Sequence, residues 1–281
     1  MPELPEVETV VRELDAVITG KKILSSQTLT QKIRIPVPEK LDISLKNRNI
    51  LSVTRRAKYI LIHLNHNEVL IIHLGMSGRI HIHDTQEKKS KQKHDHFVMN
   101  LSNGKDVVFN DPRRFGLIAL ISEDELEKHA LFSHLGPEPL SSEFTPEFLT
   151  CILKSRKGPV KVVIMDQRLV VGVGNIYASE ALFDAGIHPE TPAQSLSKDR
   201  ISLLTKSIRK VLKSAIKAGG STLKDYRKTN GDLGYFQHRF AVYDRSGKEC
   251  KGCICDIAKT GGVQKMTQAG RSTFYCPRKQ L

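Results

Sequence analysis

Apolar side chains near the start of the chain repeat at intervals of three and four residues. Within residues 5–19 the repeating positions are Val7, Val10, Val11, Leu14, Val17 and Ile18. Acidic Glu6 and Glu8 stand in the first turn of this pattern, and Gly20 follows its last turn. Helical spacing with acidic residues first and a glycine last predicts an amphipathic helix over residues 5–19.

From about residue 50 the pattern becomes that of strands. Apolar, β-branched runs over 59–64 and 69–74 are separated by Asn65-His66-Asn67-Glu68, and those over 96–101 and 107–109 flank Asn103-Gly104. Both arrangements predict β-hairpins. The first half is therefore expected to be a β-sandwich behind an N-terminal helix, with the lysine-rich stretch 88–93 as a surface turn.

A third pattern begins beyond a break at residues 135–139, which read Leu-Gly-Pro-Glu-Pro and predict a linker. Apolar residues then return at helical spacing, at Ile201, Leu204, Ile208, Val211 and Ala215. Ser197 precedes this run as a candidate N-cap, and Gly219-Gly220 follows it as a helix stop. The chain is thus expected to have an α+β fold, with strands first and helices second.

Composition narrows the class of protein. The 281 residues include 44 basic and 30 acidic side chains, a net charge of +14, and residues 221–281 carry 12 basic against 5 acidic ones. Such a surplus favours a polyanionic partner, nucleic acid before acidic lipid. No apolar run is long enough to span a membrane, and the first ten residues do not resemble a secretory signal, which favours the cytoplasm.

The first residues carry the most informative chemistry. Once Met1 is removed, the nitrogen of Pro2 is a free secondary amine, and an α-amino group titrates near ~8, well below a lysine side chain. Such an amine can condense with an aldehyde-level carbon, and the carboxylates of Glu3 and Glu6 could then move protons. The alternative is that Pro2 and Glu3 form only an exposed chain end.

Six motifs favour a catalytic Pro2 over an exposed chain end, because they occur together and in this order along the chain. They are Pro-Glu-Leu-Pro-Glu-Val-Glu at 2–8, Arg-Arg-Ala-Lys-Tyr at 55–59, His-Leu-Gly-Met-Ser-Gly at 73–78, Asp-Pro-Arg-Arg-Phe-Gly at 111–116, Gly-Val-Gly-Asn-Ile-Tyr-Ala-Ser-Glu at 172–180 and Gly-Arg-Ser-Thr-Phe-Tyr-Cys at 270–276. The chain resembles the bacterial formamidopyrimidine-DNA glycosylases, which repair 8-oxoguanine, over essentially residues 2–278.

The resemblance implies a catalytic set of Pro2, Glu3, Lys58 and Arg271, supported by Glu6. Pro2 would attack the sugar C1′ and release the damaged base, and Glu3 would protonate the opening sugar. Lys58 and Arg271 would contact phosphates. The alternative for Lys58 is a surface lysine on a strand.

The same resemblance implies residues that bind DNA. Met76, Arg113 and Phe115 would fill the void that a flipped-out base leaves. Arg114, Lys161 and Asn175 would contact phosphate, and His94 is expected at the same interface. Residues 221–235 would form the loop over the flipped base. The alternative for Met76 is core packing, although its place between Gly75 and Gly78 favours a turn.

Four cysteines near the end, Cys250, Cys253, Cys255 and Cys276, favour a metal site over disulfides. The resemblance implies a β-hairpin zinc finger with one structural Zn²⁺, but Lys279 stands where the family has its fourth cysteine. Three outcomes stay open: Cys255 completes the site, water does, or the hairpin holds without metal.

The resemblance therefore implies a fold of three parts. These are a β-sandwich with its flanking helix over residues 1–136, a helix-two-turn-helix domain over 137–235, and a zinc-finger-like β-hairpin over 236–281. The expected partner is damaged double-stranded DNA, bound by a monomer. The rival functions are an endonuclease VIII-type glycosylase for oxidised pyrimidines and a non-catalytic DNA-binding relative.

Overall fold

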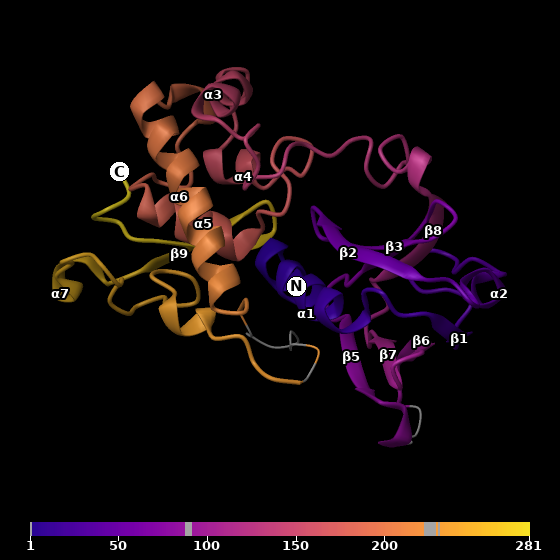
Figure 1. Cartoon of the computed structure of the whole chain (residues 1–281). Coiled ribbons are helices and arrows are strands. Elements are labelled where there is room, and N and C mark those ends of the chain that lie inside the picture. Colours follow the sequence, from indigo (N-terminus) through magenta and orange to yellow (C-terminus); the bar gives the residue numbers. More distant parts are fainter. Residues whose placement is uncertain (1, 88–91, 222–228, 230) are drawn as a thin grey trace. The chain divides into compact units, whose positions relative to one another are not determined.

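The chain folds into two compact units, each made of two separate segments of the sequence. The computed structural model describes residues 2–87, 92–221, 229 and 231–281 (Figure 1). Unit 1 comprises Met1–Ser133 and Ala218–Tyr235, and unit 2 comprises His134–Lys217 and Phe236–Leu281. The expected surface turn at 88–93 and the expected loop at 221–235 lie partly outside the described residues.

Unit 1 begins with the predicted helix. Helix α1 runs over Leu4–Ile18, as the spacing predicts, and it buries its apolar face. A second, one-turn helix, α2, covers Leu41–Leu45. Residues 2–4, which precede or open α1, are therefore tied to a helix that the core holds in place.

Two four-stranded antiparallel sheets make up the rest of unit 1. One has the order β1-β6-β7-β5, with bounds Ile23–Thr28, Asp95–Leu101, Lys105–Asn110 and Arg79–Asp84. The other has the order β2-β3-β4-β8, with bounds Ile50–Arg56, Tyr59–Leu64, Glu68–His73 and Leu117–Ser122. Apolar side chains of α1 and of both sheets form one buried cluster, so the expected sandwich is confirmed.

Both predicted hairpins are present. Strands β3 and β4 pair from Leu64 with Glu68 to Tyr59 with His73, and β6 pairs with β7. The structure extends β7 in both directions from the predicted 107–109, because backbone pairing with β5 and β6 continues past the apolar residues. The strands β1, β2, β5 and β8 were not predicted from the sequence, although β8 carries a continuous apolar run over 117–121.

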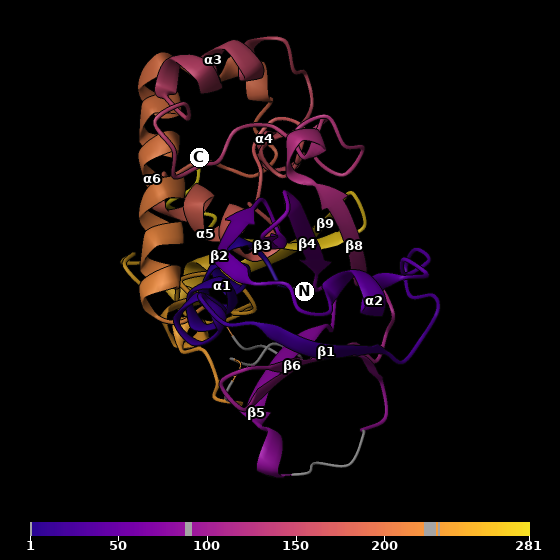
Figure 2. The ribbon, with the colours of Figure 1, turned by 45° about the vertical axis from the view of Figure 1, so that its right-hand side comes forward.

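Unit 2 is mainly helical. Its helices are α3 (Pro146–Lys154), α4 (Val160–Ile164), α5 (Asn175–Asp184), α6 (Lys198–Lys217) and α7 (Ile257–Thr260). Helix α6 contains the predicted periodic run and packs against α3 and α5 (Figure 2). Its expected cap is confirmed, since the backbone N–H of Arg200 donates to Ser197 Oγ at 3.3 Å.

A two-stranded hairpin completes unit 2. It consists of β9 (Gln264–Gln268) and β10 (Arg271–Tyr275), which pair antiparallel. Its inner residue Phe274 packs with Phe183, Val242 and the cysteines in a small cluster of its own. None of the helices that the structure describes is long and apolar enough to span a bilayer.

Candidate functional site

The N-terminal segment is buried and tied to α1, which excludes the alternative of an exposed chain end. Pro2 is buried, and Glu3 and Glu6 are 2% and 1% exposed. The backbone N–H of Glu3 donates to Glu6 Oε2 at 2.8 Å. Glu6 Oε1 accepts two more hydrogen bonds, from the backbone N–H of Ser221 at 2.8 Å and from its hydroxyl at 3.0 Å. Glu6 therefore fixes the residue that follows Pro2.

Lys58 lies in the tight turn between β2 and β3, where Arg56 pairs with Tyr59. It is 9% exposed, so the alternative of a surface lysine does not hold. The residue before it, Ala57, has a positive φ of 54°, a conformation that a side chain disfavours. The turn therefore needs support from its surroundings.

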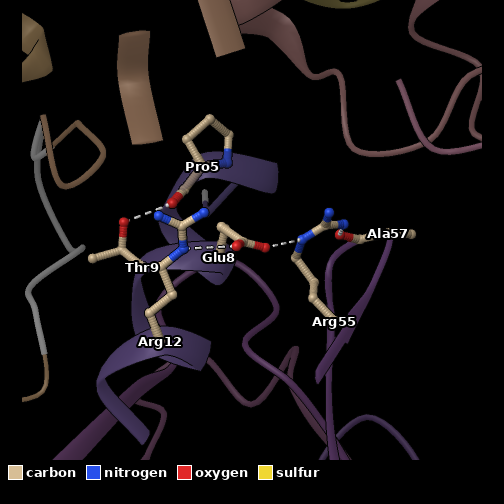
Figure 3. Close-up of polar contacts among 6 residues, drawn as sticks. All are labelled: Pro5, Glu8, Thr9, Arg12, Arg55 and Ala57. Atoms are coloured by element: carbon tan, nitrogen blue, oxygen red, sulfur yellow. Dashed lines mark hydrogen bonds and ion pairs between the residues drawn. The ribbon is translucent and has the colours of Figure 1, made fainter. Parts of the chain in front are cut away.

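That support comes from an arginine that bridges α1 and the turn (Figure 3). Arg55 donates through Nη1 to the carbonyl of Ala57 at 2.8 Å and through Nε to Glu8 at 3.0 Å. Glu8 also accepts from Arg12 at 2.8 Å. Burial alone would raise the pKa of Glu8, but its hydrogen bonds to the two arginines outweigh this and lower it. No sequence pattern beyond the Arg-Arg-x-Lys context pointed to this bridge.

Two neighbouring turns bring together the three residues expected to fill a void in DNA. Met76 lies in the turn between β4 and β5, half-buried rather than in the core, and Arg113 and Phe115 lie between β7 and β8. Phe115 is 47% exposed, and the guanidinium carbon of Arg113 is 5.1 Å from its ring centroid. The turns meet so closely that a Cβ on Gly75 would lie 2.4 Å from the carbonyl carbon of Phe115.

Asp111 joins these turns and was not recognised as important from the sequence. Its side chain is fully buried and accepts hydrogen bonds from the Ser77 hydroxyl at 2.6 Å and from the backbone N–H groups of Gly116 at 2.8 Å and Arg113 at 3.3 Å. One carboxylate thus sets the turn of Met76 against the turn of Phe115.

The other two expected contacts of unit 1 flank Asp111. The carbonyl of His94 accepts from the backbone N–H of Asp111 at 3.0 Å, and the N–H of Arg114 donates to the carbonyl of Asp111 at 3.3 Å. Both His94 and Arg114 have positive φ, 77° and 57°. Arg114 is exposed, so its guanidinium is available to an anion from outside.

In unit 2, Lys161 and Asn175 form a buried junction with the hairpin. Lys161 is 1% exposed, and its ammonium group donates to Asn175 Oδ1 and to Thr273 Oγ1, both at 2.6 Å. The amide nitrogen of Asn175 donates to the carbonyl of Ser272 at 2.8 Å. Arg271, the next residue back, is exposed at the start of β10. The structure therefore places Lys161 behind Asn175 and Arg271 rather than at the surface.

Glu180 on α5 holds the segment that leads to the cysteines. It accepts hydrogen bonds from three successive backbone N–H groups, those of Ala241 at 2.8 Å, Val242 at 3.0 Å and Tyr243 at 2.8 Å. Burial raises the pKa of Glu180 even though these hydrogen bonds oppose the rise. The sequence marked Glu180 as the end of a motif but gave no indication of this role.

The four C-terminal cysteines converge. Their Sγ atoms all lie within 4.8 Å of one another, and the hydrogen-bonding pairs are 2.8–3.8 Å apart. Thiolates arranged tetrahedrally about 2.3 Å from a zinc ion would lie about 3.8 Å apart. Burial raises the pKa of the Cys250 thiol to about 11, which disfavours a thiolate there without a nearby cation. The cluster could therefore bind a metal ion.

Lys279 does not leave this cluster one ligand short, contrary to the expectation from the sequence. The side chain of Cys255 turns toward Cys250 and Cys276, at 3.3 Å and 3.1 Å. The ammonium group of Lys279 lies instead 4.1 Å from the ring centroid of Phe183. Three thiols from residues 250–255 and one from Cys276 make the set of four.

Comparison with known proteins assigns the family. Residues 1–118 match the formamidopyrimidine-DNA glycosylase N-terminal domain, and residues 135–227 match the formamidopyrimidine-DNA glycosylase H2TH domain. Formamidopyrimidine-DNA glycosylases of Rhodospirillum rubrum and Dinoroseobacter shibae are each 48% identical over 280 and 287 residues, with all of both chains covered. A mutant of Lactococcus lactis Fpg bound to Fapy-dG-containing DNA superposes with a TM-score of 0.90 at 35% identity, over 99% of each chain. The chain belongs to the formamidopyrimidine-DNA glycosylase family.

Proposed function

We propose that this chain is a DNA repair enzyme that excises oxidised purines, 8-oxoguanine and formamidopyrimidines, from duplex DNA and then cleaves the strand. The observation that carries the proposal is the buried segment Pro2–Glu6, in which Glu6 fixes the residue beside the Pro2 nitrogen. The structures of Lactococcus lactis Fpg with Fapy-dG-containing DNA and with abasic-site DNA support it, because they are complexes of related proteins with such substrates.

The reaction begins at Pro2. With Met1 removed, its nitrogen forms a bond to C1′ of the damaged nucleotide while the bond from C1′ to the base breaks, and the base leaves with a proton. Glu3 protonates O4′ as the sugar ring opens, and a Schiff base to Pro2 results. Its positive nitrogen makes the C2′ hydrogens acidic, so loss of a C2′ proton expels the 3′-phosphate, and a second elimination expels the 5′-phosphate.

The remaining side chains serve binding. Lys58, in its supported turn, contacts the phosphate beside the lesion, and Met76, Arg113 and Phe115 occupy the void left by the flipped base. The surface contacts to phosphate come from Arg114, Asn175 and Arg271, with His94 beside the first of these. Lys161 adds its charge from behind Asn175, to which it donates a hydrogen bond.

Trapping tests the covalent step. Borohydride added to enzyme and 8-oxoguanine duplex should yield a protein–DNA adduct, and Pro2→Gly should abolish it. Glu3→Gln should still bind lesion DNA but release base about 10²–10⁴-fold more slowly. An undiminished adduct in the Pro2 variant would place the nucleophile elsewhere, with Lys58 the next residue to test. Parallel assays on oxidised-pyrimidine duplex measure the endonuclease VIII-type activity, and no nicking of any substrate would leave a DNA-binding relative.

We further propose that the four cysteines bind one structural Zn²⁺, with Cys255 as a ligand in place of a cysteine at 279. Four converging thiols supply the number and the type of ligand that zinc takes in structural sites. Purified protein should contain zinc near one equivalent, and Cys255→Ser should release it, whereas Cys151→Ser, at an exposed thiol outside the cluster, should keep it. Metal-free wild-type protein would contradict the assignment.

The division into 1–136, 137–235 and 236–281 stays part of the proposal, as does a cytoplasmic, monomeric enzyme. The first two ranges are supported by the family matches to 1–118 and 135–227. Limited proteolysis and sedimentation of the purified chain would check the boundaries and the monomer.

A further inference from the structure

Helix α1 is attached to strand β2 at two places. Asp15 Oδ1 accepts a hydrogen bond from the backbone N–H of Val53 at 3.1 Å. Glu8 Oε2 accepts one from Arg55 Nε at 3.0 Å, two residues further along the strand. Glu8 and Asp15 are seven residues apart, which is almost two full turns of an α-helix, so both carboxylates lie on the same face of α1. The helix that begins beside Pro2 is therefore fixed along this strand.

The second of these attachments continues past the strand to the turn that carries Lys58. Arg55 stands near the end of β2 and uses two different nitrogens, Nε for Glu8 and Nη1 for the carbonyl of Ala57 at 2.8 Å (Figure 3). Its side chain is only 9% exposed, so little water competes for these hydrogen bonds. One guanidinium group thus joins the helix of the nucleophile to the residue before Lys58.

The geometry of the turn explains why it needs this bond. Arg56 pairs with Tyr59, so Ala57 and Lys58 are the two central residues of a hairpin turn. Of these two only Ala57 has a positive φ, which is the φ pattern of a type II′ turn, and the first central position of that turn favours glycine. Alanine places a methyl group in a backbone region that side chains disfavour. The hydrogen bond from Arg55 opposes relaxation of this turn.

Relaxation of the turn would displace Lys58 in particular. The carbonyl that Arg55 holds belongs to the peptide bond between Ala57 and Lys58. Lys58 is 9% exposed, so its side chain cannot swing through solvent to compensate for a shifted backbone, as a surface lysine would. The position of its ammonium group therefore follows from the position of this peptide bond.

We propose that Arg55 is a positioning residue for Lys58: it holds the peptide bond before Lys58 and the second turn of α1 in one arrangement, so that the lysine meets the phosphate beside the lesion while Pro2 meets C1′. This rests on the proposed function. Arg55 then affects the reaction through Lys58 and not by touching DNA. An ion pair that only stabilised unit 1 would contribute equally whether Lys58 were present or not.

A double-mutant cycle tests this dependence. Single-turnover cleavage of an abasic-site duplex is measured for the full-length wild type, Arg55→Ala, Lys58→Ala and the double variant. Arg55→Ala alone should slow cleavage by about ten- to a hundredfold, the effect expected for a misplaced reacting or binding group. In the Lys58→Ala background the same substitution should cost less than about twofold, because no lysine is left to be positioned.

A second variant separates the turn from the ion pair. Ala57→Gly, added to Arg55→Ala, should restore most of the lost rate, because glycine adopts a positive φ without support, although the bond to Glu8 stays broken. Arg12→Ala is the matched control. Arg12 is the other arginine bonded to Glu8, at 2.8 Å, but its side chain is 65% exposed and has no printed bond to the turn. This control should stay within about twofold of the wild-type rate.

Each contrary result overturns the inference. Equal losses from Arg55→Ala with and without Lys58 would show that the ion pair only stabilises unit 1. A wild-type rate in Lys58→Ala would show that no lysine function exists to be positioned, and no recovery with Ala57→Gly would show that the turn is not the route. A wild-type enzyme that cleaves neither 8-oxoguanine nor abasic-site duplex would overturn the proposed function and the inference with it. Thermal unfolding midpoints show that the compared variants are folded.

Discussion

Replacing Asp111 by alanine should destabilise unit 1 and separate the two turns that it joins. The substitution removes three hydrogen bonds to one buried carboxylate, from Ser77 Oγ and from the N–H groups of Arg113 and Gly116. Hydrogen bonds to charged groups contribute about 1.5–3 kcal/mol each, although the long bond from Arg113 contributes less. We therefore expect a loss of about 3–5 kcal/mol, which also includes the penalty for leaving buried N–H groups without a partner.

The assay is chemical or thermal unfolding of the wild-type protein and two variants. A loss of this size should lower the unfolding midpoint by about 6 °C or more. Asp106→Asn is the control, because Asp106 lies on β7, the strand that ends just before Asp111, is only half-buried and bonds to the side chains of Thr85 and Asn100. It should change stability by less than about 1 kcal/mol.

Substitution of Asp111 should also affect how the enzyme distinguishes the base that lies opposite the lesion. Asp111 is buried and positions Arg113 and Phe115. Asp111→Ala enzyme that remains folded should therefore lose discrimination between cytosine and adenine opposite 8-oxoguanine more than it loses strand cleavage at an abasic site. If Asp111→Ala unfolded within a degree of wild type and kept opposite-base preference, the reasoning that this carboxylate joins the two turns would be refuted.

Three further predictions follow from single residues. Burial, together with nearby positive charges, lowers the pKa of His73 from its ordinary 6.5 to about 3. Between about pH 6.5 and 3, His73 is therefore protonated in the unfolded chain but neutral in the folded one. Urea titrations should show the free energy of unfolding falling as the pH drops through this range, and falling less steeply in His73→Gln. Gly75→Ala should lower the unfolding midpoint and Gly104→Ala much less, because both have positive φ but only at Gly75 would the Cβ meet backbone, that of Phe115. Arg271→Ala should weaken lesion and plain duplex alike and reduce the log–log salt slope by roughly one; an unchanged slope would remove it from the phosphate contacts.

Elements formed by local pattern could be predicted well. The helix predicted over 5–19 is α1, Leu4–Ile18, and the periodic run 201–215 lies inside α6, because an amphipathic repeat is satisfied as soon as one face is buried. The hairpins with turns at 65–68 and 103–104 could be predicted because turn-forming residues there separate apolar, β-branched runs. Strand β1 could not be predicted, because Ile23 is its one buried residue and pairing with β6, rather than an apolar pattern, holds the strand in place.

Of the candidate site, too, only part could be predicted from the sequence. Motifs in the sequence pointed to Pro2, Glu3 and Lys58, because their residue types and order are those of a known family. They gave no sign of Glu8, which with Arg55 supports the turn of Lys58, or of Asp111, which joins the turns of Met76 and Phe115, since the value of a carboxylate depends on the donors that the fold brings to it. The sequence likewise did not indicate that the buried ammonium group of Lys161 donates hydrogen bonds to Asn175 and Thr273.

By itself, then, the sequence determined the family, the helices with a clear apolar face and the candidate for the reactive nitrogen, all of which depend on residues close together in the chain. Only the tertiary structure decided how distant groups meet: that Cys255 turns toward Cys276 while Lys279 packs on Phe183, and that Thr229 reaches Glu13. The physical reason is that a hydrogen bond or a thiol cluster requires atoms to lie within about 3–4 Å, and separations of that kind are set by the packing of helices and sheets rather than by spacing along the chain.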